Sequence, residues 1–237
     1  MVSRLFPVVE PVVENLQSTL LQIEVVVTQP FAENTLIVHR GAGGDCLIVD
    51  PGFGPQAIVR AVEDLRATPV AILLTHGHVD HIAGIDHLRE RWPELPILIG
   101  RGDAPMLTDP ALNLSGQFGL PLTCPPATRL LDEGERLSFL GVEFLVREIP
   151  GHSPGHVVYI AAGAPLRILG GDVLFAGSIG RTDFPGGSQT QLVTGIQEKL
   201  FVLPDDAVVY PGHGPATTIG REKRSNPYCM TGVGGRS

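Results

Sequence analysis

The chain has 237 residues, 43% of them hydrophobic, and it carries 17 Lys and Arg against 25 Asp and Glu, for a formal net charge of −8. This length and composition are typical of one large globular domain or two small ones with a sizeable core. The acidic balance gives no electrostatic basis for binding nucleic acid, and no apolar run is long enough to predict a membrane-spanning helix.

Cysteine usage and the first residues indicate the compartment. The three cysteines form no close pair in the sequence, so we expect a reducing compartment and no disulfide framework. The N-terminal residues lack the basic region, the apolar region and the cleavage site of a signal peptide. We therefore expect a cytoplasmic protein with a loosely attached arm over residues 1–20 and a single catalytic domain over residues 21–237.

The first half of the chain predicts strands followed by alternating helices and strands. Apolar and β-branched runs indicate the strands, and apolar positions that recur on one face indicate the first helix. The second helix should end before Pro93. The expected order is strand 20–28, strand 34–39, strand 46–49, helix 56–66, strand 70–74, helix 84–91 and strand 97–99.

The second half repeats this pattern after a long connection. Residues 101–127 are rich in Pro, Gly, Asn and Thr and predict a surface loop near a substrate entrance. The elements expected next are a hairpin over 137–149, strands over 157–161 and 166–169, a helix over 189–200 and a strand over 207–210. The whole order predicts an α/β protein, a four-layer αββα sandwich.

Histidine and aspartate side chains gather directly after the strand over 70–74. Each imidazole in such a cluster needs a hydrogen-bond partner or a metal ion, and neutral imidazole with carboxylate suits zinc, iron or manganese. The groups are too closely spaced for one ion to bind them all, so we predict two adjacent half-sites. The cluster consists of His76, His78, Asp80 and His81.

Three more ligand-type residues, His152, Asp172 and His213, each follow an apolar strand and stand beside a glycine. A lone Gly-His or Gly-Asp is usually a turn or a helix cap. Their recurrence at strand ends instead predicts that they converge on one edge with the 76–81 cluster. His39 and His87 have no such setting and are interpreted as surface or packing residues. For His156 we favour a supporting role behind the ligands.

Four runs, T-H-G-H-V-D-H, P-G-H-S-P-G-H, G-G-D and P-G-H-G, resemble the motifs of the metallo-β-lactamase-fold hydrolases over about residues 21–225. The G-R-T-D-F run over residues 180–184 resembles the glyoxalase II-like branch, which includes hydroxyacylglutathione hydrolases and persulfide dioxygenases. Full glyoxalase II has a further helical domain that holds glutathione. The short stretch after His213 suggests a compact form without that domain.

The resemblance implies two divalent metal ions, zinc first, with iron or manganese as alternatives. One ion would be held by His76, His78 and His152. The other would be held by Asp80, His81 and His213, with Asp172 bridging the two.

The expected function is hydrolysis of thioesters such as S-lactoylglutathione. A metal-bound hydroxide would attack the acyl carbonyl, and Asp80 would ligate metal and orient the hydroxide. Phe175 and Ser178 would line the mouth of the site. Arg181 would either hold a substrate carboxylate or form an internal ion pair with Asp183. The basic residues Arg221, Lys223 and Arg224 would meet an anionic thiol carrier or, in our preferred interpretation, form a solvated tail.

The main alternative is a mononuclear iron persulfide dioxygenase of the same fold, which would use His76, His152 and Asp172. The acidic charge argues against a nuclease, and the complete ligand set argues against a binding module without activity. The expected partners are therefore small molecules, with no nucleic acid and no membrane. The sequence leaves the oligomeric state open.

Overall fold

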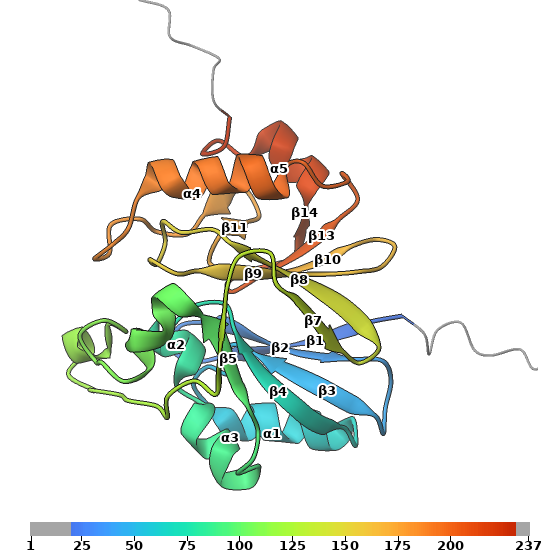
Figure 1. The fold of residues 1–237 in the computed structure, drawn as a ribbon, viewed down its shortest axis with the longest axis vertical. Helices are drawn as coiled ribbons and strands as arrows, with labels where there is room; N and C mark the ends of the chain where they lie inside the picture. The colour runs from blue at the N-terminus through green and yellow to red at the C-terminus, as the bar shows by residue number, and fades with distance from the viewer. Residues whose placement is uncertain (1–19, 231–237) are drawn as a thin grey trace, which may run out of the picture.

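A computed structural model describes residues 20–230, and these residues form two sheets packed face to face with helices on both outer faces (Figure 1). The expected arm lies outside the described residues except for Leu20. Within the described range no helix is long and apolar enough to cross a membrane. The predicted four-layer αββα sandwich is confirmed.

The first sheet contains six strands from the first half of the chain, in the order β1-β2-β3-β4-β5-β6. β1, β2 and β3 pair antiparallel, and β3 to β6 pair parallel. The strands are β1 (Gln22–Thr28), β2 (Glu33–His39), β3 (Asp45–Val49), β4 (Thr68–Leu74), β5 (Ile97–Gly100) and β6 (Arg129–Leu131).

The second sheet also has six strands, in the order β14-β13-β10-β9-β8-β7, and all its pairs are antiparallel except β10 with β13. A separate hairpin pairs β11 (Leu174–Phe175) with β12 (Ser178–Ile179). The strands of the sheet are β7 (Arg136–Phe139), β8 (Val142–Glu148), β9 (Val157–Ala161), β10 (Arg167–Gly171), β13 (Val208–Pro211) and β14 (Thr217–Thr218).

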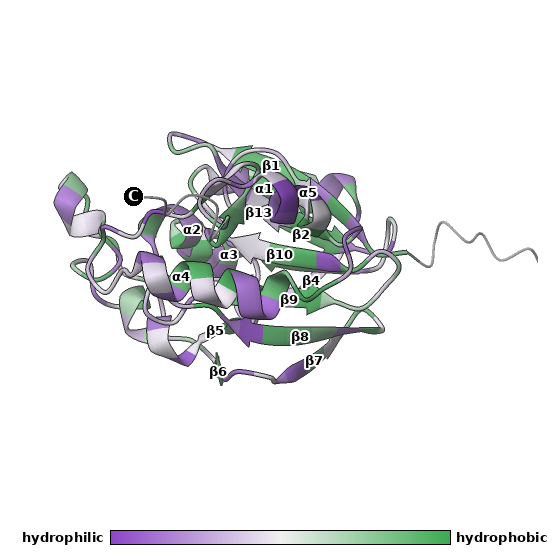
Figure 2. Cartoon of the chain, turned by 90° about the horizontal axis from the view of Figure 1, so that it is seen from above, coloured by the Kyte–Doolittle hydropathy of each residue, from purple (hydrophilic) through white to green (hydrophobic). Residues whose placement is uncertain are grey.

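The helices are short and amphipathic. In Figure 2, α4 carries hydrophilic and hydrophobic bands above the mainly hydrophobic β8 and β9, as expected for a helix that buries one face. The α-helices are α1 (Pro55–Asp64), α2 (Val79–Ile82), α3 (Ile85–Arg91), α4 (Gln189–Gly195) and α5 (Ile219–Ser225). Two 3₁₀ helices, η2 (Arg101–Leu107) and η3 (Ser115–Phe118), and one π-helical turn, η4 (Ile196–Leu200), complete the set.

Three apolar clusters correspond to the three interfaces between the four layers. The central cluster lies between the sheets and contains the fully buried Phe144 and Tyr159. A second cluster packs α1 and α3 on the first sheet, and a third packs α4, η4 and the start of α5 on the second. Burial of these faces supplies the main favourable term for folding.

Strand ends from both sheets meet at one edge of the sandwich. β4 ends just before His76, the β8–β9 connection carries His152, β10 ends just before Asp172, and β13 ends just before His213. A backbone hydrogen bond of 2.7 Å from Asn34 N to Gly212 O joins the two sheets there. The expected convergence of ligand-type residues on one edge therefore follows from the topology.

The sequence-based elements differ from the structure mainly where elements are short. The region over 101–127, predicted as loop, contains η2 and η3, and its Asp103 and Asn113 are fully buried. The basic residues interpreted as a solvated tail, Arg221, Lys223 and Arg224, belong to α5 instead, and α5 directly follows β14. Lys223 and Arg224 form ion pairs with Asp205. Periodicity does not detect helices of one or two turns, so these elements were missed.

Candidate metal centre

Three histidines from two connections turn their ring nitrogens toward one point. His152 Nε2 lies 2.9 Å from His78 Nδ1 and 3.2 Å from His76 Nε2. Ligand nitrogens about 2.05 Å from a tetrahedral zinc ion stand roughly 3.3 Å apart. The spacing of this first trio, His76, His78 and His152, is therefore close to that of a metal-binding set.

The surroundings of this trio favour neutral imidazoles with defined tautomers. His152 Nδ1 donates to the carbonyl oxygen of Arg181 at 2.8 Å, which leaves Nε2 as a lone-pair donor. Burial lowers the pKa of all three histidines, so the rings are neutral at neutral pH. Neutral imidazole is the form that binds metal.

A second trio, Asp80, His81 and His213, lies beside the first. Its closest approach is 3.2 Å, between His213 Nε2 and Asp80 Oδ2. The carboxylate of Asp172 lies between the trios. Its Oδ1 is 3.5 Å from His81 Nε2, and its Oδ2 is 3.5 Å from His152 Nε2 and 3.7 Å from His213 Nε2.

The charges of the second trio differ from those of the first. Burial opposes the charged form of His81, but Asp80, Asp172 and Asp50 together raise the pKa of His81 well above its usual range. Burial likewise opposes charge on Asp80, yet His81 and His213 hold the pKa of Asp80 below its usual range. Asp50, Asp80 and Asp172 thus lie close together around His81, and their negative charges favour a positive charge at this place.

Buried polar atoms without partners show that a metal ion fits this geometry. His81 Nε2 and Asp172 Oδ1 are buried, and neither has a hydrogen-bond partner among the described residues, although buried polar groups are normally paired. A Cβ atom on Gly212 would overlap Asp172 Oδ1 and His81 Cε1, so a glycine is needed where the backbone passes this close to the two groups. Divalent cations bound by imidazole and carboxylate would satisfy these atoms.

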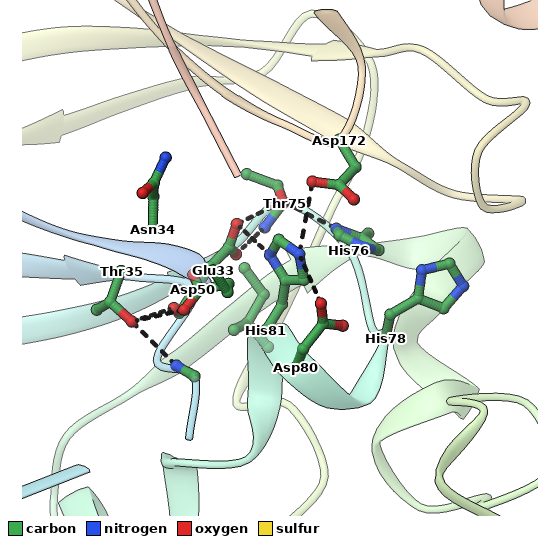
Figure 3. A network of polar contacts seen from close by, with 12 residues as sticks. Glu33, Asn34, Thr35, Asp50, Thr75, His76, His78, Asp80, His81 and Asp172 are labelled. Carbon is green, nitrogen blue, oxygen red and sulfur yellow. Dashed lines mark hydrogen bonds and ion pairs between the residues drawn. The ribbon is translucent and has the colours of Figure 1, made fainter. Parts of the chain in front are cut away.

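Asp50, at the end of β3, orients the ligand-type residues from behind (Figure 3). Its Oδ1 accepts from Thr75 N at 2.7 Å, and its Oδ2 accepts from Thr75 Oγ1 at 2.6 Å and lies 3.1 Å from His81 Nδ1. Asp50, His76 and His81 also form a compact set. Because both oxygens of Asp50 already have partners, we interpret Asp50 as the group that directs His81 Nε2 toward Asp172.

Glu33 extends this network (Figure 3). It is fully buried, and its Oε2 accepts from Thr28 Oγ1 at 2.8 Å and from Thr35 Oγ1 at 3.0 Å. Burial is the largest cause that raises the pKa of Glu33 well above its usual range. Thr35 Oγ1 also lies 2.9 Å from the carbonyl oxygen of Asp50, so its single hydroxyl proton is shared between Glu33 and Asp50. The polar network thus runs from β2 to the ligand-type residues.

Asp103 on η2 connects the two loops of the first trio. Its Oδ2 accepts from Gly77 N at 3.3 Å and from Ser153 Oγ at 2.5 Å, and its Oδ1 accepts from Gly155 N at 2.6 Å. The carboxylate is fully buried. Asp103 therefore fixes the His76–His78 loop relative to the loop that carries His152.

Asn34 makes the equivalent connection for the second trio. Its Nδ2 donates to Pro211 O at 3.0 Å and to Gly214 O at 2.8 Å. These carbonyl groups flank His213 in the sequence. One side chain of β2 therefore fixes the turn that presents His213.

His156 lies behind the site and belongs to neither trio. Its ring stacks on His76 with centroids 4.8 Å apart, and its Nε2 accepts from Asp172 N at 3.0 Å. These contacts agree with the predicted supporting position. His39 is buried and accepts from Gly41 N, whereas His87 is partly exposed beside Glu90.

A cavity of about 400 Å³ opens onto both trios, and the three predicted substrate residues line it. Phe175 lies beside His213, with ring centroids 6.2 Å apart, and Ser178 follows on the same hairpin. The Arg181 guanidinium forms a bidentate pair with Asp183 at 3.0 and 2.8 Å. It also lies 4.4 Å from the centroid of the Phe184 ring. Of the two expectations for Arg181, the internal ion pair is therefore the one the structure shows.

Sequence reasoning brought the seven ligand-type residues together but missed the groups that support them. Asp50, Asp103, Asn34 and Glu33 have ordinary local contexts, since acidic and amide residues are common at strand ends and in loops. A burial signal was available for Glu33 and Asn34, which begin the mainly apolar β2. The contacts of Asp50, Asp103 and Asn34 join chain segments far apart in sequence, whereas those of Glu33 with Thr28 and Thr35 are local.

Comparison with known proteins identifies the family. The family described as "Metallo-beta-lactamase superfamily" matches residues 28–213. "Probable metallo-hydrolase YqgX" from Bacillus subtilis (strain 168) is 42% identical over 184 residues, covering 77% of this chain and 86% of that protein. "Hydroxyacylglutathione hydrolase GloC" from Haemophilus influenzae is 35% identical over 210 residues, covering 88% of this chain and 98% of that protein.

Solved structures give the same result. The BLEG-1 B3 metallo-beta-lactamase superposes with a TM-score of 0.84 at 38% identity, covering 89% of this chain and 100% of that chain. TTHA1623 in a di-iron-bound form superposes with a TM-score of 0.77 at 36% identity, covering 86% of this chain and 99% of that chain. ETHE1 from Myxococcus xanthus superposes with a TM-score of 0.71 at 26% identity, covering 87% of this chain and 83% of that chain. With this fold, these His and Asp clusters and these relatives, the chain belongs to the metallo-beta-lactamase superfamily and is a metallo-hydrolase of that superfamily.

Proposed function

We propose that this metallo-hydrolase is a dinuclear hydrolase of thioesters from the glyoxalase II-like branch, with S-lactoylglutathione as a test substrate. The observation that carries the proposal is the position of the Asp172 carboxylate between two separate trios of ligand-type residues. The likeness to the hydroxyacylglutathione hydrolase GloC supports the reaction class.

In this proposal one ion is held by His76, His78 and His152, and a second by Asp80, His81 and His213. Asp172 would bridge the two ions. We expect zinc, with iron or manganese as alternatives, and the di-iron form of the related TTHA1623 supports iron in particular. When bound, two such ions supply Lewis acidity and lower the pKa of a water molecule between them.

The residues around the ions would position water and substrate. The pKa of Asp80 lies below its usual range, so its carboxylate stays ionised and can accept a hydrogen bond from the attacking water. Asp50 and Asp103 would hold the histidines in place during the reaction. A thiol leaving group has a pKa of about 8.5 and needs little help from a general acid.

The second candidate is a mononuclear iron dioxygenase of persulfides. The likeness to ETHE1 and the proximity of His76, His152 and Asp172 favour it. The same structure also brings His78, Asp80, His81 and His213 to the site, which would leave four ligand-type groups without an ion. This surplus favours the dinuclear hydrolase.

Steady-state assays with three substrates test the proposal. The protein, loaded with zinc, iron or manganese, is supplied with S-lactoylglutathione, glutathione persulfide or a β-lactam. We expect thioester hydrolysis and no oxygen uptake. Oxygen consumption on adding persulfide, without thioester hydrolysis, would support the dioxygenase. Hydrolysis of the β-lactam alone would reject the thioester class.

A further inference from the structure

Phenylalanine side chains from four different segments form the walls of the cavity. Phe184 lies beside the first trio, with ring centroids 5.2 Å from His78, and Phe175 lies beside His213 of the second. Farther out, Phe31 from the β1–β2 turn and Phe118 from η3 meet with ring centroids 5.6 Å apart. The metal centre thus lies at the inner end of a slot with aromatic walls.

The outer part of the slot leaves apolar surface in water. Phe31 is 37% exposed and Phe118 is 56% exposed. A smaller cavity of about 30 Å³ adjoins them, lined by Phe31, Phe53, Val79, Ser115, Phe118 and Leu120. Exposed aromatic side chains gathered at the mouth of a site are typical of a binding surface for an apolar group.

The charged groups of the slot do not match a charged thiol carrier. Among the described residues that line the cavity, Arg181 is the one Arg or Lys. Its guanidinium already has both oxygens of Asp183 as partners and lies over the ring of Phe184. Glutathione carries two carboxylates, and a site that recognises this charge typically pairs it with arginine or lysine side chains.

From this slot we propose that the physiological substrate is a thioester with an apolar acyl chain, and that the site does not recognise the charge of the thiol carrier. This inference rests on the proposed thioester hydrolase. The carbonyl must lie at the metal centre, so one half of the substrate extends outward along the Phe31 and Phe118 rings that line the cavity. Thiol carriers are typically polar, and therefore we assign the acyl half to the aromatic slot.

Substrate series that vary one half at a time test this assignment. The first series joins acetyl, butyryl, hexanoyl and octanoyl groups to N-acetylcysteamine. The second keeps the acetyl group and lengthens an alkyl thiol. We expect kcat/KM to rise about two- to fourfold per methylene in the acyl series until the slot is filled. We expect little change in the thiol series.

The carrier is tested with hexanoyl esters of glutathione and of N-acetylcysteamine, for which we expect kcat/KM values within about threefold of each other. As a readout independent of turnover, calorimetry with S-alkyl thioethers, which cannot be hydrolysed, should show binding that tightens with chain length. A flat acyl series, a steeper thiol series, or a tenfold preference for the glutathione ester would overturn the inference, whereas hydrolysis of no thioester would reject the proposed function itself.

Side-chain variants locate the effect. Phe118→Ala should reduce the ratio of hexanoyl to acetyl kcat/KM by about fivefold or more, because it removes a wall of the slot. Leu112→Ala is the matched control, since Leu112 is 45% exposed in the same loop region and does not line the cavity. An unchanged ratio in Phe118→Ala, or an equal decrease in Leu112→Ala, would contradict the proposed slot.

Discussion

Replacing Asp103 by alanine removes the carboxylate that joins the two loops of the first trio. Three donors lose their acceptor: Gly77 N at 3.3 Å, Ser153 Oγ at 2.5 Å and Gly155 N at 2.6 Å. A buried donor without a partner costs about 1–3 kcal/mol. The Ser153 hydroxyl can rotate and the Gly77 bond is long, so we expect a total loss of about 3–5 kcal/mol in the free energy of unfolding.

The Asp103→Asn variant should lose less, since an amide keeps one oxygen acceptor. Urea unfolding of the chelator-treated protein measures both losses. Asp109→Asn is the matched control, because Asp109 is exposed in the same region and its carboxylate accepts a hydrogen bond from Ala111 N within the same turn. This substitution should change the free energy of unfolding by less than about 0.5 kcal/mol. A loss in Asp103→Ala below about 1 kcal/mol would refute the connecting role.

The difference in the free energy of unfolding between the parent and Asp103→Asn should also depend on pH. Burial raises the pKa of Asp103 from 3.8 to about 6. The folded state therefore binds this proton more tightly than the unfolded state. This proton's contribution to the stability of the folded state is complete below pH 3.8, and it is lost as the pH rises through about 6. The parent should thus gain about 1 kcal/mol relative to Asp103→Asn between about pH 7 and 5, and a constant difference would contradict the raised pKa.

Four further results are expected. Asp172→Ala should abolish activity and lower the metal content more than the replacement of any single histidine. Two metal ions per chain in elemental analysis of this variant would exclude a bridging role. Asp80→Asn should keep the fold, checked by circular dichroism, but lower kcat about a hundredfold or more, roughly 3 kcal/mol; turnover within a few-fold of the parent would make Asp80 a bystander. Asn34→Leu removes the two donors that fix the His213 turn and should weaken binding of one metal equivalent about tenfold or more while sparing the other, measured by metal titration; equal weakening of both would contradict this. The KM for S-lactoylglutathione should be high, because the described cavity offers few cationic partners, and a micromolar value in steady-state kinetics would reveal a dedicated carrier site.

Sequence patterns predicted the layers of the fold and the convergence of the site because both depend on local signals. Apolar runs identified the long strands, and ligand-type residues at the ends of β4, β10 and β13 share an edge as a consequence of topology. The end of the predicted helix over 56–66 was close to that of α1 (Pro55–Asp64). Helix ends are uncertain by a residue or two in any case.

The groups that support the site could not be predicted in this way. The Asp103 carboxylate accepts hydrogen bonds from Gly77 N and Gly155 N, which are 26 and 52 residues away in the sequence. Asn34 Nδ2 donates to the carbonyl oxygen of Gly214, which is 180 residues away in the sequence. Such contacts follow from the packing of complete sheets. The partner of Arg181 was open for a different reason, because a nearby Asp183 and a substrate carboxylate satisfy a guanidinium equally well.

The number of metal ions per chain tests the central claim most directly. The protein is purified without chelator, and its metal content is measured by elemental analysis against protein concentration. Two trios separated by the Asp172 carboxylate predict two zinc, iron or manganese ions per chain. A single iron per chain that does not increase when more metal is added would contradict the dinuclear centre.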